Sequence, residues 1–225
     1  MPHPQQPPKY TIPRQRQPQR RRGVIRYEQL LDATEALLAA HPDSDISLSL
    51  VATTAQVPLP SIYHFFPNKE AILVALAARY HTALAAIARE DLDPAPECWQ
   101  DIIRRRQLGG VTFLNAHPSA LRLFMGAGVS AQVRTLDLQG NASLSALRAA
   151  EFRRWFDCSA IPDLELRLAI AIGIMDGIWA ISWSRHGRIT QDFVNESIRA
   201  SVAYLRCFLP EILPGVETTS EQRGC

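Results

Sequence analysis

Between Leu59 and Lys69 the sequence places side chains that can contact a phosphate backbone or the edge of a base. The Tyr63 hydroxyl and the Lys69 ammonium can donate hydrogen bonds to phosphate oxygens. Ser61 and His64 can meet base edges, and Leu59 offers an apolar contact, for example to a thymine methyl group. His64 is equally well explained as an exposed bystander. These residue types favour contact with a nucleic acid over catalysis.

The residues around this stretch predict two short helices joined by a tight turn, from Ser47 to Phe66. An apolar face with helical spacing is formed by Leu48, Val51, Ala52 and Ala55. Ser47 has the hydroxyl of an N-cap. The second helix should run from about Leu59 to Phe65, with Ile62 and Phe66 facing inward. This pattern is a helix-turn-helix, whose second helix enters the DNA major groove.

A helix over Tyr27–Ala40 is predicted before this motif, and Pro42 should end it. The three helices would form one DNA-binding domain, residues 23–70. Its expected core consists of Leu30, Leu31, Leu37, Leu38, Ile46, Leu48, Val51, Ile62 and Phe66.

The segment SLSLVATTAQVPLPSIYHFFPNKEAIL resembles the DNA-binding signature of the TetR-type transcriptional repressors. The matching residues are Ser47, Val51, Ala52, Ala55, Val57, Ile62, Tyr63, His64, Phe65, Phe66, Lys69 and Glu70. The resemblance extends from about Val24 to Leu73. It implies an all-α fold in which Tyr63 and Lys69 bind backbone phosphate, and a C-terminal helical domain for dimerisation and ligand binding.

Three residues depart from the family pattern. Gln56 stands where glycine is usual, and a left-handed residue there would cost about 1 kcal/mol. Pro58 and Pro60 replace serine and glycine, so the start of the second helix has few free amides. The predicted DNA-contacting residues are Arg20, Arg21, Arg22, Ser47, Pro58, Leu59, Ser61, Tyr63, His64 and Lys69.

The positive charge of the chain is concentrated at its N-terminus. Residues 1–27 carry seven basic and no acidic residues, so the remaining residues carry a net charge of −5 although the whole chain carries +2. Residues 1–22, rich in Pro, Gln and Arg, are expected to form a disordered basic arm. For Arg20 to Arg22 we favour phosphate or minor-groove contact over a solvated tail; for the part nearer the terminus we favour the tail.

The rest of the chain is predicted to be helical from 71 to 210, followed by a tail over 211–225. A long helix should leave the DNA-binding domain at Asn68 and enter this second domain. Residues 126–141 are ambiguous, and Pro162 fits the first position of another long helix.

The last two long helices are the candidates for dimerisation, because the first of them is apolar nearly all round. In TetR-type proteins these helices form a four-helix bundle with a second subunit. The predicted contact residues are Gly173, Gly177, Val194, Ile198, Val202 and Leu205.

A ligand pocket is expected between the C-terminal helices. Its candidate lining residues are Phe113, Phe124, Trp155, Asp176, Trp179 and Trp183, each of which also fits an ordinary core position. A carboxylate on an apolar helix needs a partner. For Asp176 a structural hydrogen bond or a dimer contact is the favoured explanation, and a cationic ligand beside Trp179 is the alternative.

Other function classes find no support in the sequence. No HExxH, GxSxG, GxxxxGK[ST] or GxGxxG motif occurs, so we expect neither an enzyme nor a cofactor. Cys98, Cys158, Cys207 and Cys225 lack metal-type spacing, which indicates reduced thiols in a cytosolic protein and no metal. The sequence therefore predicts a cytoplasmic, homodimeric repressor that a small-molecule effector releases from operator DNA. The alternative is a DNA-bound protein whose second domain binds a protein partner.

Overall fold

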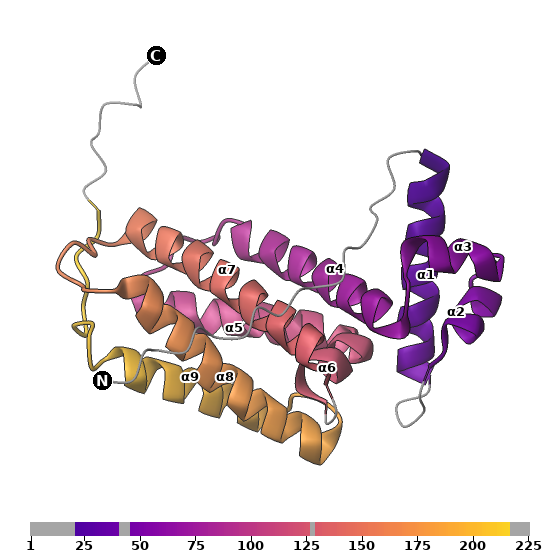
Figure 1. The fold of residues 1–225 in the computed structure, drawn as a ribbon. Coiled ribbons are helices and arrows are strands. Elements are labelled where there is room, and N and C mark those ends of the chain that lie inside the picture. The colour runs from indigo at the N-terminus through magenta and orange to yellow at the C-terminus, as the bar shows by residue number, and fades with distance from the viewer. Residues whose placement is uncertain (1–20, 41–45, 127–128, 217–225) are drawn as a thin grey trace, which may run out of the picture.

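The computed structural model describes residues 21–40, 46–126 and 129–216. Within these ranges the regular structure is helical, apart from one isolated bridge between Phe156 and Gly215. Figure 1 shows a small group of helices at one end and a larger bundle at the other. The all-α fold predicted from the sequence is confirmed.

The helices at the first end are α1 (Arg21–Ala40), α2 (Leu48–Thr54) and α3 (Leu59–Phe65). All nine predicted core residues of this domain are buried. The Ser47 hydroxyl caps α2 by accepting a hydrogen bond from the Leu50 amide at 3.2 Å, as predicted. One boundary is wrong, because α1 begins at Arg21 and not at Tyr27. Arginine favours the helix, and Gly23 alone does not stop it.

Helix α4 (Lys69–Arg89) runs from the DNA-binding end into the larger bundle (Figure 1). The Asn68 side chain accepts a hydrogen bond from the Ala71 amide at 2.9 Å, which confirms the predicted cap. Among the described helices, only α4 has the length and apolar composition of a membrane span. These two features are weak support for a span, since much of its apolar surface packs inside the protein at Ile72, Leu76 and Tyr80.

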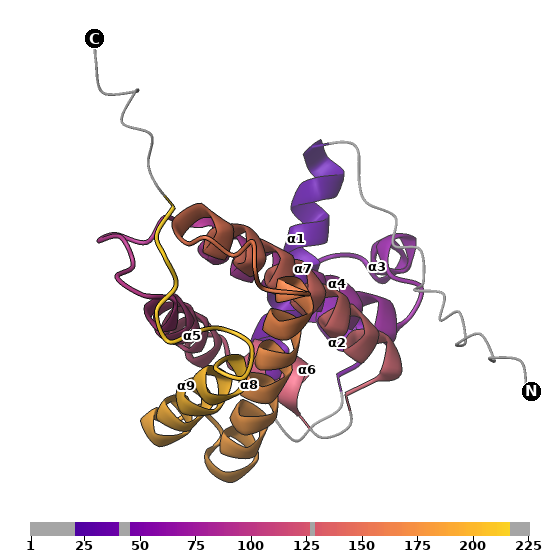
Figure 2. The ribbon, with the colours of Figure 1, turned by 90° about the vertical axis from the view of Figure 1, so that its left-hand side faces the viewer.

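The larger bundle is built from α5 (Trp99–Ala116), α6 (Pro118–Met125), α7 (Ala131–Trp155), α8 (Leu164–His186) and α9 (Gln191–Leu205). The most extensive helix contacts are those of α8 with α9, of α4 with α7 and of α7 with α8. Figures 1 and 2 both show α8 and α9 side by side at an edge of the bundle.

Three boundaries in this half differ from the prediction. Helix α7 is continuous through Gly140, where the sequence pattern is ambiguous. Pro162 is not the first residue of a helix, because α8 starts at Leu164 after Asp163 adopts a left-handed φ of 52°. The predicted tail is partly folded: Leu213 is buried, and the Val216 amide donates to the Trp155 carbonyl at 3.1 Å.

The DNA-binding helices share a hydrophobic core with the larger bundle. One cluster of buried residues extends from α1 through α4 to α6 and Trp179 of α8. Polar contacts join α6 to α1, where the Ser119 hydroxyl donates to the Glu35 carbonyl at 2.7 Å. Arg79 of α4 forms ion pairs with Asp32 and Glu35 of α1 at 2.6 and 2.5 Å. The orientation of the DNA-binding helices therefore depends on where α4 and α6 lie.

Candidate functional sites: a helix-turn-helix face and an internal cavity

The turn between α2 and α3 keeps the left-handed conformation that usually calls for glycine. Gln56 has a φ of 54°, and it is one of two non-glycine residues with positive φ in the described chain. The turn closes through hydrogen bonds from the Gln56 amide to the Thr53 carbonyl, 3.1 Å, and from the Val57 amide to the Ala52 carbonyl, 3.0 Å. The predicted turn geometry is present, and Gln56 carries the strain.

Helix α3 presents an exposed outer face. Tyr63 and Leu59 are 54% and 41% exposed, and His64 and Pro60 are also exposed. The inner face is fixed to α1 through aromatic contacts. The ring centroid of Tyr27 lies 5.0 Å from that of Phe66 and 5.9 Å from that of Phe65.

The other predicted DNA-contacting residues lie around this helix. Ser61 is half-buried, and its amide donates to the Pro58 carbonyl at 2.8 Å. Pro58 is exposed and makes no side-chain cap for α3. Lys69 is the half-buried first residue of α4, and Ser47 is exposed.

The basic arm is partly helical. Arg21 and Arg22 are exposed in the first turn of α1, so they are held in a helix and not in a flexible arm. Arg20 lies outside the described residues. Contact of Arg21 and Arg22 with DNA stays a prediction.

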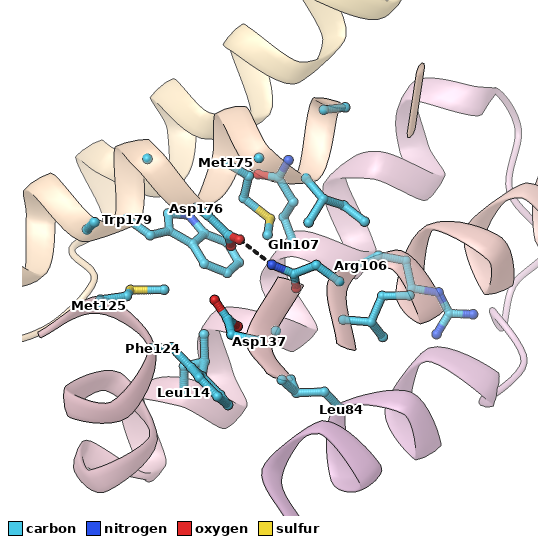
Figure 3. Close-up of a pocket in the computed structure, with 18 of the residues that line it drawn as sticks. Leu84, Arg106, Gln107, Leu114, Phe124, Met125, Asp137, Met175, Asp176 and Trp179 are labelled. Atoms are coloured by element: carbon cyan, nitrogen blue, oxygen red, sulfur yellow. Dashed lines mark hydrogen bonds between the residues drawn. The ribbon is translucent and has the colours of Figure 1, made fainter. Parts of the chain in front are cut away.

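The larger bundle contains a cavity of about 530 Å³ that is lined by residues from α4 to α9 (Figure 3). Its volume falls in the range of small-molecule sites. Its apolar lining includes Leu84, Leu114, Phe124, Met125, Met175 and Trp179. A sequence-predicted pocket between the C-terminal helices is thus present, and two of the predicted aromatic residues line it.

Three other predicted lining residues lie elsewhere. Phe113 stacks on His117 with ring centroids 4.3 Å apart. Trp155 packs against the second core cluster, and Trp183 packs against the first. Their positions depend on the direction in which each helix face points. The presence of an aromatic residue in the sequence does not reveal that direction.

The polar lining of the cavity was only partly anticipated. Asp176 lies at the cavity, and its carboxylate accepts a hydrogen bond from the Asn141 amide group at 2.6 Å. Residues that the sequence did not single out are His81, Arg106, Gln107, Arg134, Asp137, Asn141 and Arg148. Four of them, Arg134, Asp137, Asn141 and Arg148, share one face of α7. Their helical spacing was detectable, but the ambiguous pattern over 126–141 hid it.

The carboxylates in and beside the cavity differ in their partners. Asp137 accepts from Arg134 at 2.6 Å and from His81 Nε2 at 3.2 Å. Glu151, further along the same helix α7 and not among the residues that line the cavity, accepts from Arg106 at 2.5 Å and from Arg148 at 2.7 Å. Burial lowers the pKa of Arg148 to about 10, although Glu151 opposes this shift.

Within the described residues Asp176 has no cationic partner, and the hydrogen bond that it accepts comes from the neutral Asn141. Desolvation raises the pKa of Asp176 to about 7, and the charge of Asp137 adds to the increase. Arg134 and the Asn141 hydrogen bond act in the opposite direction. A carboxylate in this environment titrates near neutral pH and gains from a positive charge placed beside it.

A stripe of exposed apolar residues follows one face of α8. Leu166, Ile170 and Ile181 are exposed, and Gly173 and Gly177 lie between them on the same face. A Cβ atom added at either glycine would meet nothing within 4 Å. The two predicted glycines are therefore open to an outside partner.

The dimer residues predicted on α9 need correction. Val194, Val202 and Leu205 are buried in the core of the chain itself, so they are not available to a second chain. Ile198 is partly buried between the two core clusters. Apolar spacing on α9 marked its inward face, because a helix at an edge also needs an apolar side against its own subunit.

Among the described residues, no group of three or more His, Cys, Asp or Glu side chains is placed to hold a metal ion.

Comparison with known proteins identifies the DNA-binding end. Residues 30–76 match the family of bacterial regulatory proteins called the tetR family. The HTH-type transcriptional regulator EthR of Mycobacterium tuberculosis is 38% identical over 69 residues, which are 31% of this chain and 32% of EthR. The alignment therefore spans about a third of the length of this curated relative.

Solved structures resemble a much larger part of the chain. A TetR-family transcriptional regulator from Streptomyces coelicolor aligns with a TM-score of 0.65 at 21% identity, over 82% of this chain and 99% of that protein. The fatty acid degradation regulator FadR of Bacillus halodurans aligns with a TM-score of 0.60 at 18% identity, over 80% and 94%. Residues 30–76 thus match the tetR family of bacterial regulatory proteins, and the chain has the fold of the solved TetR-family regulators.

Proposed function

We propose that this protein is a sequence-specific DNA-binding transcriptional regulator that acts as a homodimeric repressor. A small-molecule effector that binds the internal cavity would release it from its operator. A role of this kind belongs in the bacterial cytoplasm.

The observation that carries the proposal is the course of α4. Its first residue, Lys69, lies beside the helix-turn-helix, and His81, Leu84 and Ile87 further along the same helix line the cavity. A ligand that displaces this wall must move α4. Because Arg79 on α4 is ion-paired with α1, such a movement reaches the DNA-binding helices. Ligand and DNA would then favour different positions of α4, which is the requirement for release by population shift.

The outer face of α3 supports DNA contact. Its exposed Tyr63 and the adjacent Lys69 suit phosphate oxygens, which position a protein on DNA without selecting a sequence. Leu59, Ser61 and His64 are placed to meet base edges if α3 enters the major groove as recognition helices do. The proline-rich start offers few donors, so apolar contacts and the arginines of α1 would contribute to specificity.

The exposed stripe of α8 supports a dimer. Two copies packed through Ile170, Gly173 and Gly177 would cover apolar surface that one chain leaves in water. A dimer also sets the separation of two recognition helices, and half-sites on DNA about one helical turn apart require a fixed separation.

The alternative is a DNA-bound protein whose second domain binds a protein partner and no metabolite. A filled core with an exposed patch would favour that function. The cavity favours the effector instead, and we attribute the exposed patch on α8 to contact with a second copy of the chain. Catalysis is not proposed.

The test is selection of bound DNA from a random pool, followed by affinity measurements on the selected site. A palindromic or pseudo-palindromic site is expected. Lys69→Ala should weaken binding on selected and unrelated DNA alike, and should reduce the slope of log K against log salt by about 1 per subunit. Gln139→Ala, an exposed change on α7, is the matched control and should leave both quantities unchanged.

A second pair of variants distinguishes contacts that hold the protein on any DNA from contacts that select a base sequence. Tyr63→Phe removes one hydroxyl and should weaken binding to every sequence, whereas Leu59→Ala should alter the preferred base at one position. Failure to enrich any site, together with unchanged DNA affinity in Tyr63→Phe and Lys69→Ala, would contradict the proposed function.

A further inference from the structure

The cavity contains one carboxylate for which the described residues supply no counter-charge. Asp137 is paired with Arg134, and Glu151 is paired with both Arg106 and Arg148. Asp176 accepts its hydrogen bond from a neutral amide. Removing a carboxylate from water without a cation beside it is unfavourable. A cationic ligand that binds next to this carboxylate would therefore stabilise its ionised form.

None of the charged groups described around Asp176 forms an ion pair with its carboxylate. On α7 the nearest are Asp137, which repels the Asp176 charge, and Arg134, which is committed to Asp137. His81 on α4 faces Asp137. Figure 3 shows the carboxylates of Asp137 and Asp176 approaching the same part of the cavity from α7 and α8, while Arg106 of α5 extends away from it.

The walls beside the two carboxylates are aromatic or polarisable. Trp179 lies one turn after Asp176 on α8, and Phe124, Met125 and Met175 line the same end. The Trp179 indole is fixed by a hydrogen bond to the Ser197 hydroxyl at 2.9 Å. It also lies against Gly110, where an added Cβ would be 3.4 Å from the ring. A fixed indole next to a carboxylate is a favourable environment for an organic cation.

We propose that the cavity takes a lipophilic organic cation, with its positive charge between Asp176 and Asp137 and its apolar body against Trp179, Phe124 and the methionines. The inference rests on the proposed effector function and names the chemical class of the effector. An anionic ligand would meet two carboxylates at this end. A neutral ligand would supply no counter-charge when Asp176 is ionised.

The ligand class can be tested on the purified full chain by titration calorimetry, without DNA. The probes are phenylalkyl trimethylammonium ions with chains of three, four and six carbons. Each is compared with its neutral tert-butyl isostere and with a phenylalkyl carboxylate of similar length. At least one cation is expected to bind, about tenfold or more tightly than its isostere. Binding of the neutral or anionic series in preference to the cations, or of no cation, would overturn the proposal.

Asp176→Asn tests the residue directly, because it keeps the side-chain shape and an acceptor for Asn141. The variant should lose the preference for the cation, with roughly a tenfold loss of cation affinity, and should still bind the neutral isostere unchanged. Glu97→Gln, at an exposed position outside the cavity, is the control and should keep the preference. A cation preference that survives Asp176→Asn would contradict the assignment.

Proton release provides a readout that a purely structural role would not change. A cation beside Asp176 lowers its pKa from about 7, so binding at pH 7 should release about half a proton. Calorimetry in two buffers of different ionisation enthalpy measures this number. The release should disappear in Asp176→Asn, and cation affinity should rise with pH through 7.

The experiments distinguish an error in the proposed ligand class from an error in the proposed function. If the cations bind but leave operator DNA bound, effector release is wrong and the ligand class stands. If a neutral or anionic metabolite releases the DNA, the function stands and the ligand class is wrong.

Discussion

Replacing the Asp176 carboxylate by an amide should stabilise the protein, and the gain should depend on pH. Burial raises the pKa of Asp176 from 3.8 to about 7. A carboxyl group with a raised pKa in the folded state stays neutral there while it ionises in the unfolded chain. Its contribution to stability is therefore fully present below pH 3.8 and is lost as the pH rises to 7. The amide introduced by Asp176→Asn does not titrate, so the variant avoids this loss.

The magnitude follows from the size of the pKa shift. Each pH unit between the two pKa values changes the free energy of unfolding by about 1.4 kcal/mol. The stability gain of Asp176→Asn should therefore be larger at pH 8 than at pH 5 by about 2 kcal/mol, after allowance for relaxation of a buried site. Above about pH 8 the gain should be constant.

Urea unfolding at pH 5 and pH 8, at one protein concentration, measures the difference. Asn141→Ala is the opposite perturbation, because it removes the hydrogen bond that holds the pKa of Asp176 down. This variant should lose more stability at pH 8 than at pH 5. Equal stability changes at the two pH values in both variants would refute a half-buried Asp176 carboxylate without a cationic partner.

Three other perturbations test particular features. Gln56→Gly should raise the free energy of unfolding by about 0.5–1 kcal/mol, because glycine accepts the φ of 54° without strain. A lower melting temperature than wild type would show that the turn is not left-handed. Gly140→Ala should destabilise by about 1–3 kcal/mol, since its Cβ would lie 2.2 Å from His81 Nδ1, and an unchanged melting curve would contradict the close approach of α4 and α7. Ile170→Glu should shift the protein toward monomer in sedimentation velocity, whereas the exposed Gln139→Ala should not, and an intact Ile170→Glu dimer would exclude the α8 stripe.

The DNA-binding domain was predictable because its determinants are local. The apolar spacing, the caps at Ser47 and Asn68 and the aromatic pair Phe65–Phe66 all act within a few residues. The same rules failed where a helix is held by a distant neighbour. Helix α7 continues through Gly140, where an added Cβ would collide with the His81 ring of α4, and no pattern within α7 indicates that close approach.

The sequence predicted which half of the chain holds the cavity, but it did not predict which side chains line it. Asp176 was visible as a lone carboxylate in an apolar run. Its surroundings were not, because Asn141 and Asp137 come from another helix and His81 from a third. The face of α9 was misassigned for a related reason. An apolar stripe shows that a helix is buried on one side, but not whether its partner is the same subunit.

By itself the sequence determined the helices, the helix-turn-helix and the family of the DNA-binding end, because hydrogen-bonded turns and apolar periodicity depend on neighbouring residues. Only the tertiary structure decided which of the described charges stay unpaired, which faces remain exposed and how α4 connects the cavity to α1. Those properties depend on which helix faces meet. The half-buried Asp176 has no cationic partner among the described residues, and the side chains that surround it lie far from it in the chain.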